Sequence, residues 1–320
     1  MKPLIILTGP TAAGKTELSI KLAKTVGGEI ISADSMQIYK KMDIGTAKIM
    51  PEEMEGIPHY LVNELDPDEE FHVVRFQQMA KQALKKIYDQ GKIPVVVGGT
   101  GFYIQALLYD IDFSKEDSDP EYREKLRRLA EEKGNTYLHE MLSLVDPESA
   151  QAIHENNIKR VIRALEYYEK TGSKISRHNE QERKKESCYN YVYFVLSHDR
   201  EILYDRINKR VDKMLEAGLI GEVEQLAGQG YTKDMVSMQG IGYKEVFDYL
   251  EGKQDLDVTA ERIKKDTRHF AKRQLTWFRR EKDVTMVNRQ DYQNEDEILA
   301  FMLGKIKEKG IWDGSVKTIL

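Results

Sequence analysis

The chain has 320 residues, of which 40% are hydrophobic and 32% charged, and its formal net charge is -5 at pH 7. This composition allows a sizeable buried core, and the negative charge argues against a protein that coats nucleic acid by its overall charge. The single cysteine, Cys188, excludes an internal disulfide and a zinc site built from several thiolates, as is typical of a reducing compartment.

The first residues, Met1 and Lys2, lead directly into an apolar run at 3–7, without the apolar segment and cleavage site of a secretory signal. No apolar run approaches the roughly 18 residues that a membrane-spanning helix needs. We therefore expect a soluble cytoplasmic protein that has no membrane partner.

Short apolar runs that end in Gly, Ser or Asp predict strands, and helix-length segments separate them. The expected strands cover 4–8, 29–33, 93–97, 189–196 and 284–287. The clearest helix covers 73–90, where apolar residues recur at spacings of three and four, and others are expected at 17–24, at 200–225 and after 295. This order predicts an α/β fold with a parallel sheet flanked by helices on both faces.

The region 112–187 has a different pattern, with dense charge and helical periodicity at 122–133 and 158–170 but no convincing strand. It is interpreted as a helical insertion. The expected domains are therefore a core formed by 1–112 and 188–320, and an insertion domain at 113–187.

The stretch GPTAAGKT at 9–16 fits the phosphate-loop pattern G-x-x-x-x-G-K-[ST] at every position, which predicts a P-loop NTPase-like fold. Its glycines let successive N–H groups point inward, the next helix offers its positive N-terminus, and Lys15 adds a mobile charge. Thr16 can hold Mg²⁺, the expected metal cofactor. The pattern does not name the ligand, because any diphosphate would satisfy it. The expected diphosphate-binding residues are Gly9, Pro10, Thr11, Ala12, Ala13, Gly14, Lys15 and Thr16.

Asp34 ends the second expected strand, and in open α/β sheets ligands bind at the carboxyl ends of strands. A carboxylate there can accept a proton from an attacking nucleophile, but the position equally suits an Asx turn or a helix cap. Thr100, in the glycine-rich turn after the third strand, can offer a hydroxyl to the same crevice or cap a helix.

The third expected strand, at 93–97, runs into glycine, whereas a typical P-loop ATPase has an Asp or Glu there as its Walker B residue. ATP hydrolysis is therefore disfavoured. A transferase that uses the loop to grip a leaving group fits better.

Two basic segments accompany the loop. Arg206, Arg210 and Lys213 share one helix face, which is either solvated or closes over phosphate. The segment 261–280 interleaves basic residues with Phe270, Trp277 and Phe278, a mixture that suits an RNA backbone with bases to stack on, although at least one of these aromatic residues is expected in the core.

Taken together, these segments resemble the tRNA dimethylallyltransferase (tRNA isopentenyltransferase) family. The matching motifs follow the family order and cover most of the chain: GPTAAGKT at 9–16, ISADSMQIYKKMDIGTAK at 31–48, VVVGGTGFYIQALL at 95–108, SMQGIGYKE at 237–245 and TRHFAKRQLTWFRR at 267–280. The chain lacks the cysteines of the zinc finger that eukaryotic members often carry, so it resembles the bacterial type.

The resemblance implies transfer of a dimethylallyl group from dimethylallyl diphosphate to N6 of adenosine 37 in tRNA. It implies that Asp34 is the general base, that Lys15 and Thr16 hold the diphosphate and Mg²⁺, and that Arg210 neutralises the leaving group. Thr100 matches a position that contacts the target nucleotide, and is counted with Asp34, Arg210 and Lys15 among the catalytic residues.

The partners are therefore dimethylallyl diphosphate and the anticodon stem-loop of tRNA, gripped by the insertion domain, and we expect the protein to act as a monomer. The expected tRNA-binding residues are Asp34, Ser35, Met36, Gln37, Thr100, Arg123, Asn157, Lys159, Arg160, Lys272 and Arg273. The alternatives are a P-loop kinase that acts on a nucleoside or metabolite, and an RNA-binding module whose phosphate loop is a relic.

Overall fold

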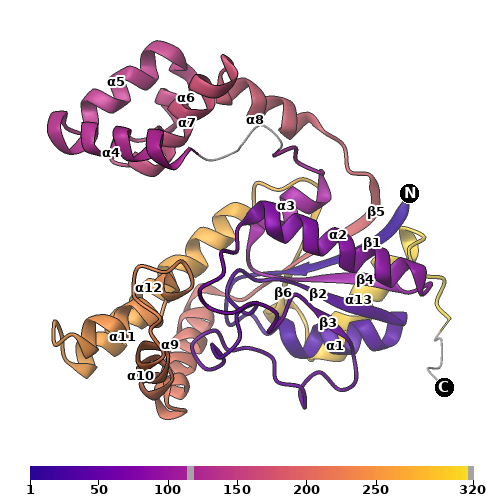
Figure 1. The fold of residues 1–320 in the computed structure, drawn as a ribbon. Helices are drawn as coiled ribbons and strands as arrows, with labels where there is room; N and C mark the ends of the chain where they lie inside the picture. The colour runs from indigo at the N-terminus through magenta and orange to yellow at the C-terminus, as the bar shows by residue number, and fades with distance from the viewer. Residues whose placement is uncertain (114–118, 316–320) are drawn as a thin grey trace. The chain divides into compact units, whose positions relative to one another are not determined.

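The computed structural model describes residues 1–113 and 119–315, which form two compact units (Figure 1). The larger unit comprises Met1–Leu108 and Cys188–Leu320, and the smaller comprises Tyr109–Ser187. The first boundary thus follows Leu108 instead of residue 112. Within the described ranges, no helix is long and apolar enough to cross a membrane.

The larger unit is built on a six-stranded sheet with the strand order β3-β2-β4-β1-β5-β6. Every neighbouring pair is parallel, so the expected parallel sheet is confirmed. Five strands match the apolar runs, whereas β3 has only two residues and was missed. The strands are β1 (Lys2–Thr8), β2 (Gly28–Ala33), β3 (His59–Tyr60), β4 (Ile93–Gly98), β5 (Tyr189–Ser197) and β6 (Val284–Asn288).

Helices cover both faces of this sheet, which is why its central strands are apolar throughout. α1 (Lys15–Val26) and α13 (Glu295–Glu308) lie on one face, and α2 (Val73–Asp89) and α3 (Gly101–Leu108) lie on the other (Figure 1). On the second face, the ring of Phe76 stacks on that of Tyr103 with centroids 4.5 Å apart. The core on the first face includes Leu7, Leu22, Phe194 and Met302.

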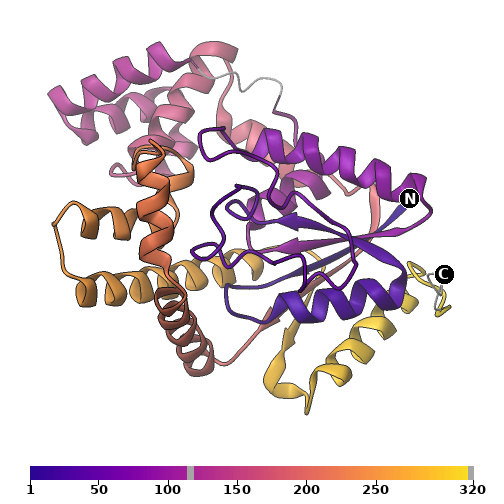
Figure 2. The same cartoon turned by 60° about the horizontal axis from the view of Figure 1, so that its bottom comes forward.

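A further group of helices gathers on one side of the sheet (Figure 2). The single helix expected at 200–225 is wrong, because Gly218 adopts a left-handed backbone (φ 99°) and divides the segment into two helices. The helices of this group are α9 (Arg200–Glu216), α10 (Leu219–Gly228), η1 (Ser237–Gln239), α11 (Tyr243–Leu250) and α12 (Leu256–Phe278), and a further short helix, η2 (Arg289–Asp291), follows β6.

The smaller unit contains five helices and no strand among its described residues, around a core that includes Leu126, Leu142 and Val161. Asp146 begins one of these helices: its carboxylate accepts hydrogen bonds from the backbone N–H and the hydroxyl of both Ser149 and Ser176. The helices are α4 (Pro120–Lys133), α5 (Asn135–Val145), α6 (Pro147–Ala152), α7 (Ile158–Thr171) and α8 (Ile175–Lys184).

Candidate active site

A cavity of about 810 Å³ lies at the carboxyl ends of β1, β2 and β4, within the larger unit. Its walls come from the phosphate loop, the segment after β2, the turn between β4 and α3, and helices α9 and α12. The expected site residues of this unit that line it are Thr11, Ala12, Gly14, Lys15, Thr16, Asp34, Ser35, Met36, Gln37, Thr100, Arg210 and Arg273. Motifs that are far apart in the sequence therefore share one cavity, as the rule for parallel sheets predicts.

The phosphate loop owes its curl to three residues with positive φ: Gly9 (152°), Ala12 (63°) and Gly14 (81°). The first N–H groups of α1 follow directly, and because they have no partner within the helix they can bind an anion. The ammonium group of Lys15 lies against the loop, donating to the carbonyl oxygens of Gly9 at 3.0 Å and Pro10 at 2.8 Å.

Positive charge is concentrated beside this loop. Burial and, to a smaller extent, the nearby charge of Arg210 lower the pKa of Lys15 to about 8, while Asp34 opposes the shift. Burial also lowers the pKa of Arg210, while Asp34 again favours the charged form. The three side chains are thus close enough to interact, and their electrostatics favour an anion that would stabilise both cations.

Three side chains from distant segments hold the backbone of the loop. Arg206 on α9 donates from Nε to the Ala12 carbonyl oxygen at 2.8 Å. Gln274 on α12 accepts a hydrogen bond from the Thr11 N–H at 3.0 Å, and Arg289 after β6 donates to the Gly14 carbonyl oxygen at 3.2 Å. Of these three residues, sequence analysis noted only Arg206, as part of the basic stripe. The position of Arg289 directly after β6 was a usable signal, because the ends of parallel strands meet at one edge.

Asp34 combines the two interpretations left open by the sequence. Its Oδ1 accepts from the backbone N–H groups of Met36 at 2.8 Å and Gln37 at 3.3 Å, which forms an Asx turn. Its Oδ2 makes no hydrogen bond with the described residues, and the side chain lines the cavity. The turn therefore fixes the carboxylate while one oxygen stays available for a substrate.

Thr100 directly precedes α3 and lines the cavity. Its backbone carbonyl oxygen accepts a hydrogen bond from the Tyr103 N–H at 3.0 Å. Its own N–H donates to the Ala33 carbonyl oxygen at 3.1 Å. The turn that carries Thr100 is thus bonded to the residue beside Asp34.

Apolar side chains from several elements form a further part of the cavity lining, the apolar wall. Asp34 is the only carboxylate among the described residues that line the cavity, whereas several lysine and arginine residues line it. A small apolar group attached to a diphosphate would therefore find both a cationic and an apolar surface there. The apolar residues are Met36, Val97, Ile207, Val211, Met214, Val236, Ile241, Ile263 and Phe270.

A half-buried carboxylate forms a clamp at one edge of the cavity. The carboxylate of Glu222 on α10 accepts from the backbone N–H groups of Asp43 at 2.8 Å, Ile44 at 2.7 Å and Gly45 at 3.1 Å. It also accepts from the Tyr243 hydroxyl at 2.6 Å. Sequence analysis missed this clamp, since Glu222 resembles any helical surface residue.

α12 presents different residues on its two sides. Lys272 and Arg273 are exposed and line a surface hollow of about 420 Å³ that also includes His269 and Arg280. Phe278 is fully buried, which confirms that one aromatic residue of this segment belongs to the core.

The expected tRNA-binding residues of the smaller unit differ in their environment. Lys159 and Arg160 are exposed in the first turn of α7, and Asn157 is exposed just before it. The guanidinium of Arg123, in contrast, pairs with the buried carboxylate of Glu166, with Nε at 2.9 and 3.0 Å from its two oxygens. Arg123 thus already has a structural partner within its own unit.

The donors in the cavity fit a magnesium ion bound mainly through its substrate. Mg²⁺ prefers oxygen ligands, keeps several waters and usually takes one or two carboxylates together with substrate phosphates. Thr16 supplies a hydroxyl and Asp34 a carboxylate at this cavity. Among the described residues, no cluster of three or more His, Cys, Asp or Glu side chains could cage a metal without a substrate.

Residues 37–281 match the family model for IPP transferases. The chain belongs to the IPP transferase family. The tRNA dimethylallyltransferase of Lachnoclostridium phytofermentans is 60% identical to this chain. The alignment covers 97% of this chain and 99% of that relative. The tRNA dimethylallyltransferase of Acetivibrio thermocellus is 52% identical and covers 93% and 96%. The family resemblance expected from the motifs is therefore confirmed.

Solved structures of IPP transferases show the same fold. The full-length tRNA isopentenylpyrophosphate transferase of Bacillus halodurans superimposes with a TM-score of 0.73 at 44% identity, over 97% of this chain and 98% of that chain. A eukaryotic dimethylallyltransferase acting on tRNA gives a TM-score of 0.81 at 33% identity, over 96% of this chain and 80% of that chain.

Proposed function

We propose that the chain transfers a dimethylallyl group from dimethylallyl diphosphate to N6 of adenosine 37 in tRNA, releasing diphosphate. The observation that carries this proposal is the meeting of Asp34, Lys15 and Arg210 at one cavity that also has an apolar wall. The alignments with the similar relatives cover almost the whole length of each relative, and the names of these relatives support the same reaction.

At the leaving-group end, the phosphate loop binds the diphosphate. The N–H groups at the start of α1, Lys15 and Arg210 face the negative charge that grows on the departing oxygens, which is the arrangement that lowers the barrier to displacement. Thr16 would hold Mg²⁺ together with the substrate, and the ion would supply further charge neutralisation.

At the nucleophile end, Asp34 accepts the proton of N6 as the new nitrogen–carbon bond forms. The lone pair of an aryl amine is delocalised into the ring, so the amine is a weak nucleophile and benefits from a positioned base. The Asx turn holds the carboxylate at the cavity while Oδ2 remains available. Thr100, bonded to the neighbouring strand end, contacts the target nucleotide.

The adenine must leave its stack to enter this cavity, as in other enzymes that modify bases. The apolar wall then surrounds the dimethylallyl group and keeps water from a carbon that becomes cationic during displacement. The tRNA contacts include Ser35, Met36 and Gln37 beside the cavity and Lys272 and Arg273 on α12.

In the smaller unit, we propose that Asn157, Lys159 and Arg160 meet the anticodon stem-loop, because they are exposed at the start of α7. Arg123 acts there through its ion pair with Glu166, orienting neighbouring groups. The enzyme works as a monomer in the cytoplasm, where its tRNA substrate is found.

The direct test is incubation with labelled dimethylallyl diphosphate and unmodified tRNA, followed by nucleoside analysis. Label at N6 of adenosine 37 is the expected result. A tRNA with guanosine at position 37 is the matched control and should stay unlabelled. No label in either RNA would overturn the proposal, and phosphate transfer from ATP to a small acceptor would indicate a kinase instead.

A further inference from the structure

Gln274 is a buried amide that lines the cavity. It lies on α12, only 7% of the residue is exposed, and both ends of its side chain are occupied. Its Oε1 accepts from the Thr11 N–H at 3.0 Å, while its Nε2 donates to the Gly99 carbonyl oxygen at 2.9 Å. Because one end must accept and the other must donate, only an amide side chain satisfies both contacts.

The turn at 98–101, whose Gly99 carbonyl oxygen accepts the hydrogen bond from Nε2 of Gln274, is closely packed on both sides. A Cβ atom added to Gly99 would lie 2.3 Å from Nε2 of Gln274, and one added to Gly101 would lie 2.3 Å from Cδ1 of Trp277. On the other side, a Cβ at Gly98 would lie 2.2 Å from the Ala33 carbonyl oxygen. The glycines of this turn are therefore required by close approach, and α12 determines where the turn lies.

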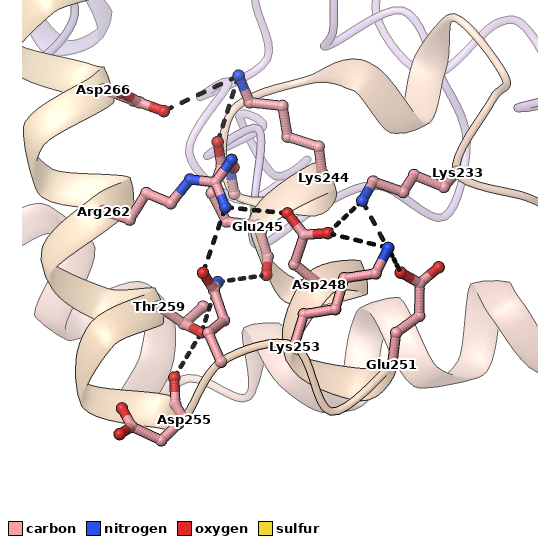
Figure 3. A network of polar contacts seen from close by, with 12 residues as sticks. Lys233, Lys244, Glu245, Asp248, Glu251, Lys253, Asp255, Thr259, Arg262 and Asp266 are labelled. Atoms are coloured by element: carbon pink, nitrogen blue, oxygen red, sulfur yellow. Dashed lines mark hydrogen bonds and ion pairs between the residues drawn. The ribbon is translucent and has the colours of Figure 1, made fainter.

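Contacts other than those of Gln274 also hold α12 in place. A network of polar contacts fastens its N-terminal half to α11 and the neighbouring loops (Figure 3). In this network Arg262 donates to Asp248 at 2.9 Å, and Lys244 lies 3.9 Å from the Asp266 carboxylate. Replacing Gln274 should therefore change the two contacts of its side chain without displacing the helix.

We propose that Gln274 is a positioning residue that fixes the phosphate loop relative to the turn carrying Thr100, and so sets the diphosphate against the acceptor base. Thr11 belongs to the loop that holds the leaving group, and Gly99 precedes the residue that contacts the nucleotide. In a displacement the nucleophile, the carbon and the leaving oxygen must align, and an error of about 1 Å costs on the order of 100-fold in rate. This inference rests on the proposed function.

Two substitutions separate the roles of the two ends. Gln274→Met removes both hydrogen bonds at similar volume. Gln274→Glu keeps an acceptor for Thr11 but, when ionised, places a carboxylate against the Gly99 carbonyl oxygen; when protonated, it can donate again. We expect the kcat of Gln274→Met to fall about 100-fold at every pH. The kcat of Gln274→Glu should fall similarly at pH 8 and recover as the pH is lowered towards 6, relative to the unsubstituted protein.

The affinity for tRNA should stay within about twofold, because both ends of the amide are used inside the protein. Gln78→Glu is the matched control, since Gln78 is exposed on α2, and it should show neither effect. Unchanged kcat in Gln274→Met, loss confined to tRNA affinity, or a pH-independent loss in Gln274→Glu would overturn the proposal.

A measurement without catalysis keeps this test separate from that of the proposed function. Hydrogen exchange at the Thr11 amide, followed by NMR with and without inorganic diphosphate, reports the contact directly. Exchange should be at least about tenfold faster in Gln274→Met than in the unsubstituted protein, because the Thr11 amide loses its hydrogen-bond acceptor and is less protected from solvent. Equal exchange would overturn the inference even if prenyl transfer is established, whereas absent transfer with faster exchange would overturn only the reaction.

Discussion

The Nε of Arg206 donates a hydrogen bond of 2.8 Å to the carbonyl oxygen of Ala12, a residue whose backbone is left-handed with φ 63°. A left-handed alanine costs about 1 kcal/mol or more, so its conformation needs support from its surroundings. Arg206 provides this support by holding the Ala12 carbonyl oxygen in a hydrogen bond from a cation. Arg206, expected either to be solvated or to close over phosphate, therefore contacts the loop itself.

Arg206→Met should weaken binding of inorganic diphosphate about tenfold, because loss of a charge-assisted hydrogen bond costs about 1.5 kcal/mol and lets the loop relax. Isothermal titration calorimetry measures this change. Arg200→Met is the matched control, since Arg200 lies on the same helix over the ring of Tyr204 and does not line the cavity. Equal affinity in the two variants would contradict a role for the Ala12 contact.

Asp34→Asn should reduce turnover by about 10²–10⁴-fold while leaving the affinity for tRNA nearly unchanged. The amide oxygen of asparagine can still accept from the Met36 and Gln37 N–H groups, so the turn survives and only the base is lost. Single-turnover kinetics and a filter-binding assay separate the two quantities. Asp34→Ala removes the turn as well, and a parallel loss of tRNA binding in both variants would identify Asp34 as a recognition residue.

Binding of inorganic diphosphate should weaken as the pH rises above about 8, the value to which burial and the nearby charge of Arg210 lower the pKa of Lys15. Below this pKa the lysine is protonated and attracts the anion, whereas above it the charge is lost and affinity falls by up to about tenfold per pH unit. Lys15→Met should bind more weakly and lose this part of the pH dependence. The Lys15→Met variant also controls for titration of diphosphate itself. Identical pH profiles of binding in the variant and the unsubstituted protein would refute the assignment of this pH dependence to Lys15.

Neutralising Lys272 and Arg273 together should weaken tRNA binding and flatten its dependence on salt. Each phosphate contact contributes roughly 0.7 to 0.9 to the slope of log K against log salt, so the slope should decrease by about 1.5. Lys307 and Lys309, exposed at the end of α13, provide a matched double neutralisation that should leave the slope unchanged. Equal slopes for both double variants would show that α12 does not meet the RNA backbone.

The sequence predicted the sheet, the phosphate loop and the convergence of Asp34 with Thr100, because strand ends in a parallel sheet share an edge. It could not predict contacts that depend on tertiary packing. Gln274 is one polar residue on a basic helix, and nothing in its neighbourhood shows that it spans two loops. The break at Gly218 was missed because apolar periodicity continues through it. Arg123 was expected to contact tRNA, and its ion pair with Glu166 was missed because the two residues are distant in sequence.

The Glu222 clamp should govern the order of one cavity wall. Glu222→Gln places an amide where three backbone N–H groups and a hydroxyl donate, so the free energy of unfolding should fall by about 2–4 kcal/mol and the KM for dimethylallyl diphosphate should rise. Tyr243→Phe removes only one of these hydrogen bonds and should cost about 1 kcal/mol.

Glu224→Gln is the matched control, because Glu224 is exposed two residues further along α10. Chemical denaturation and steady-state kinetics measure both effects of the clamp. A Glu222→Gln protein as stable and active as Glu224→Gln would show that the segment around Gly45 holds its shape without the carboxylate. A loss of stability with unchanged KM would instead limit the clamp to folding, since the cavity wall would then be ordered by other contacts.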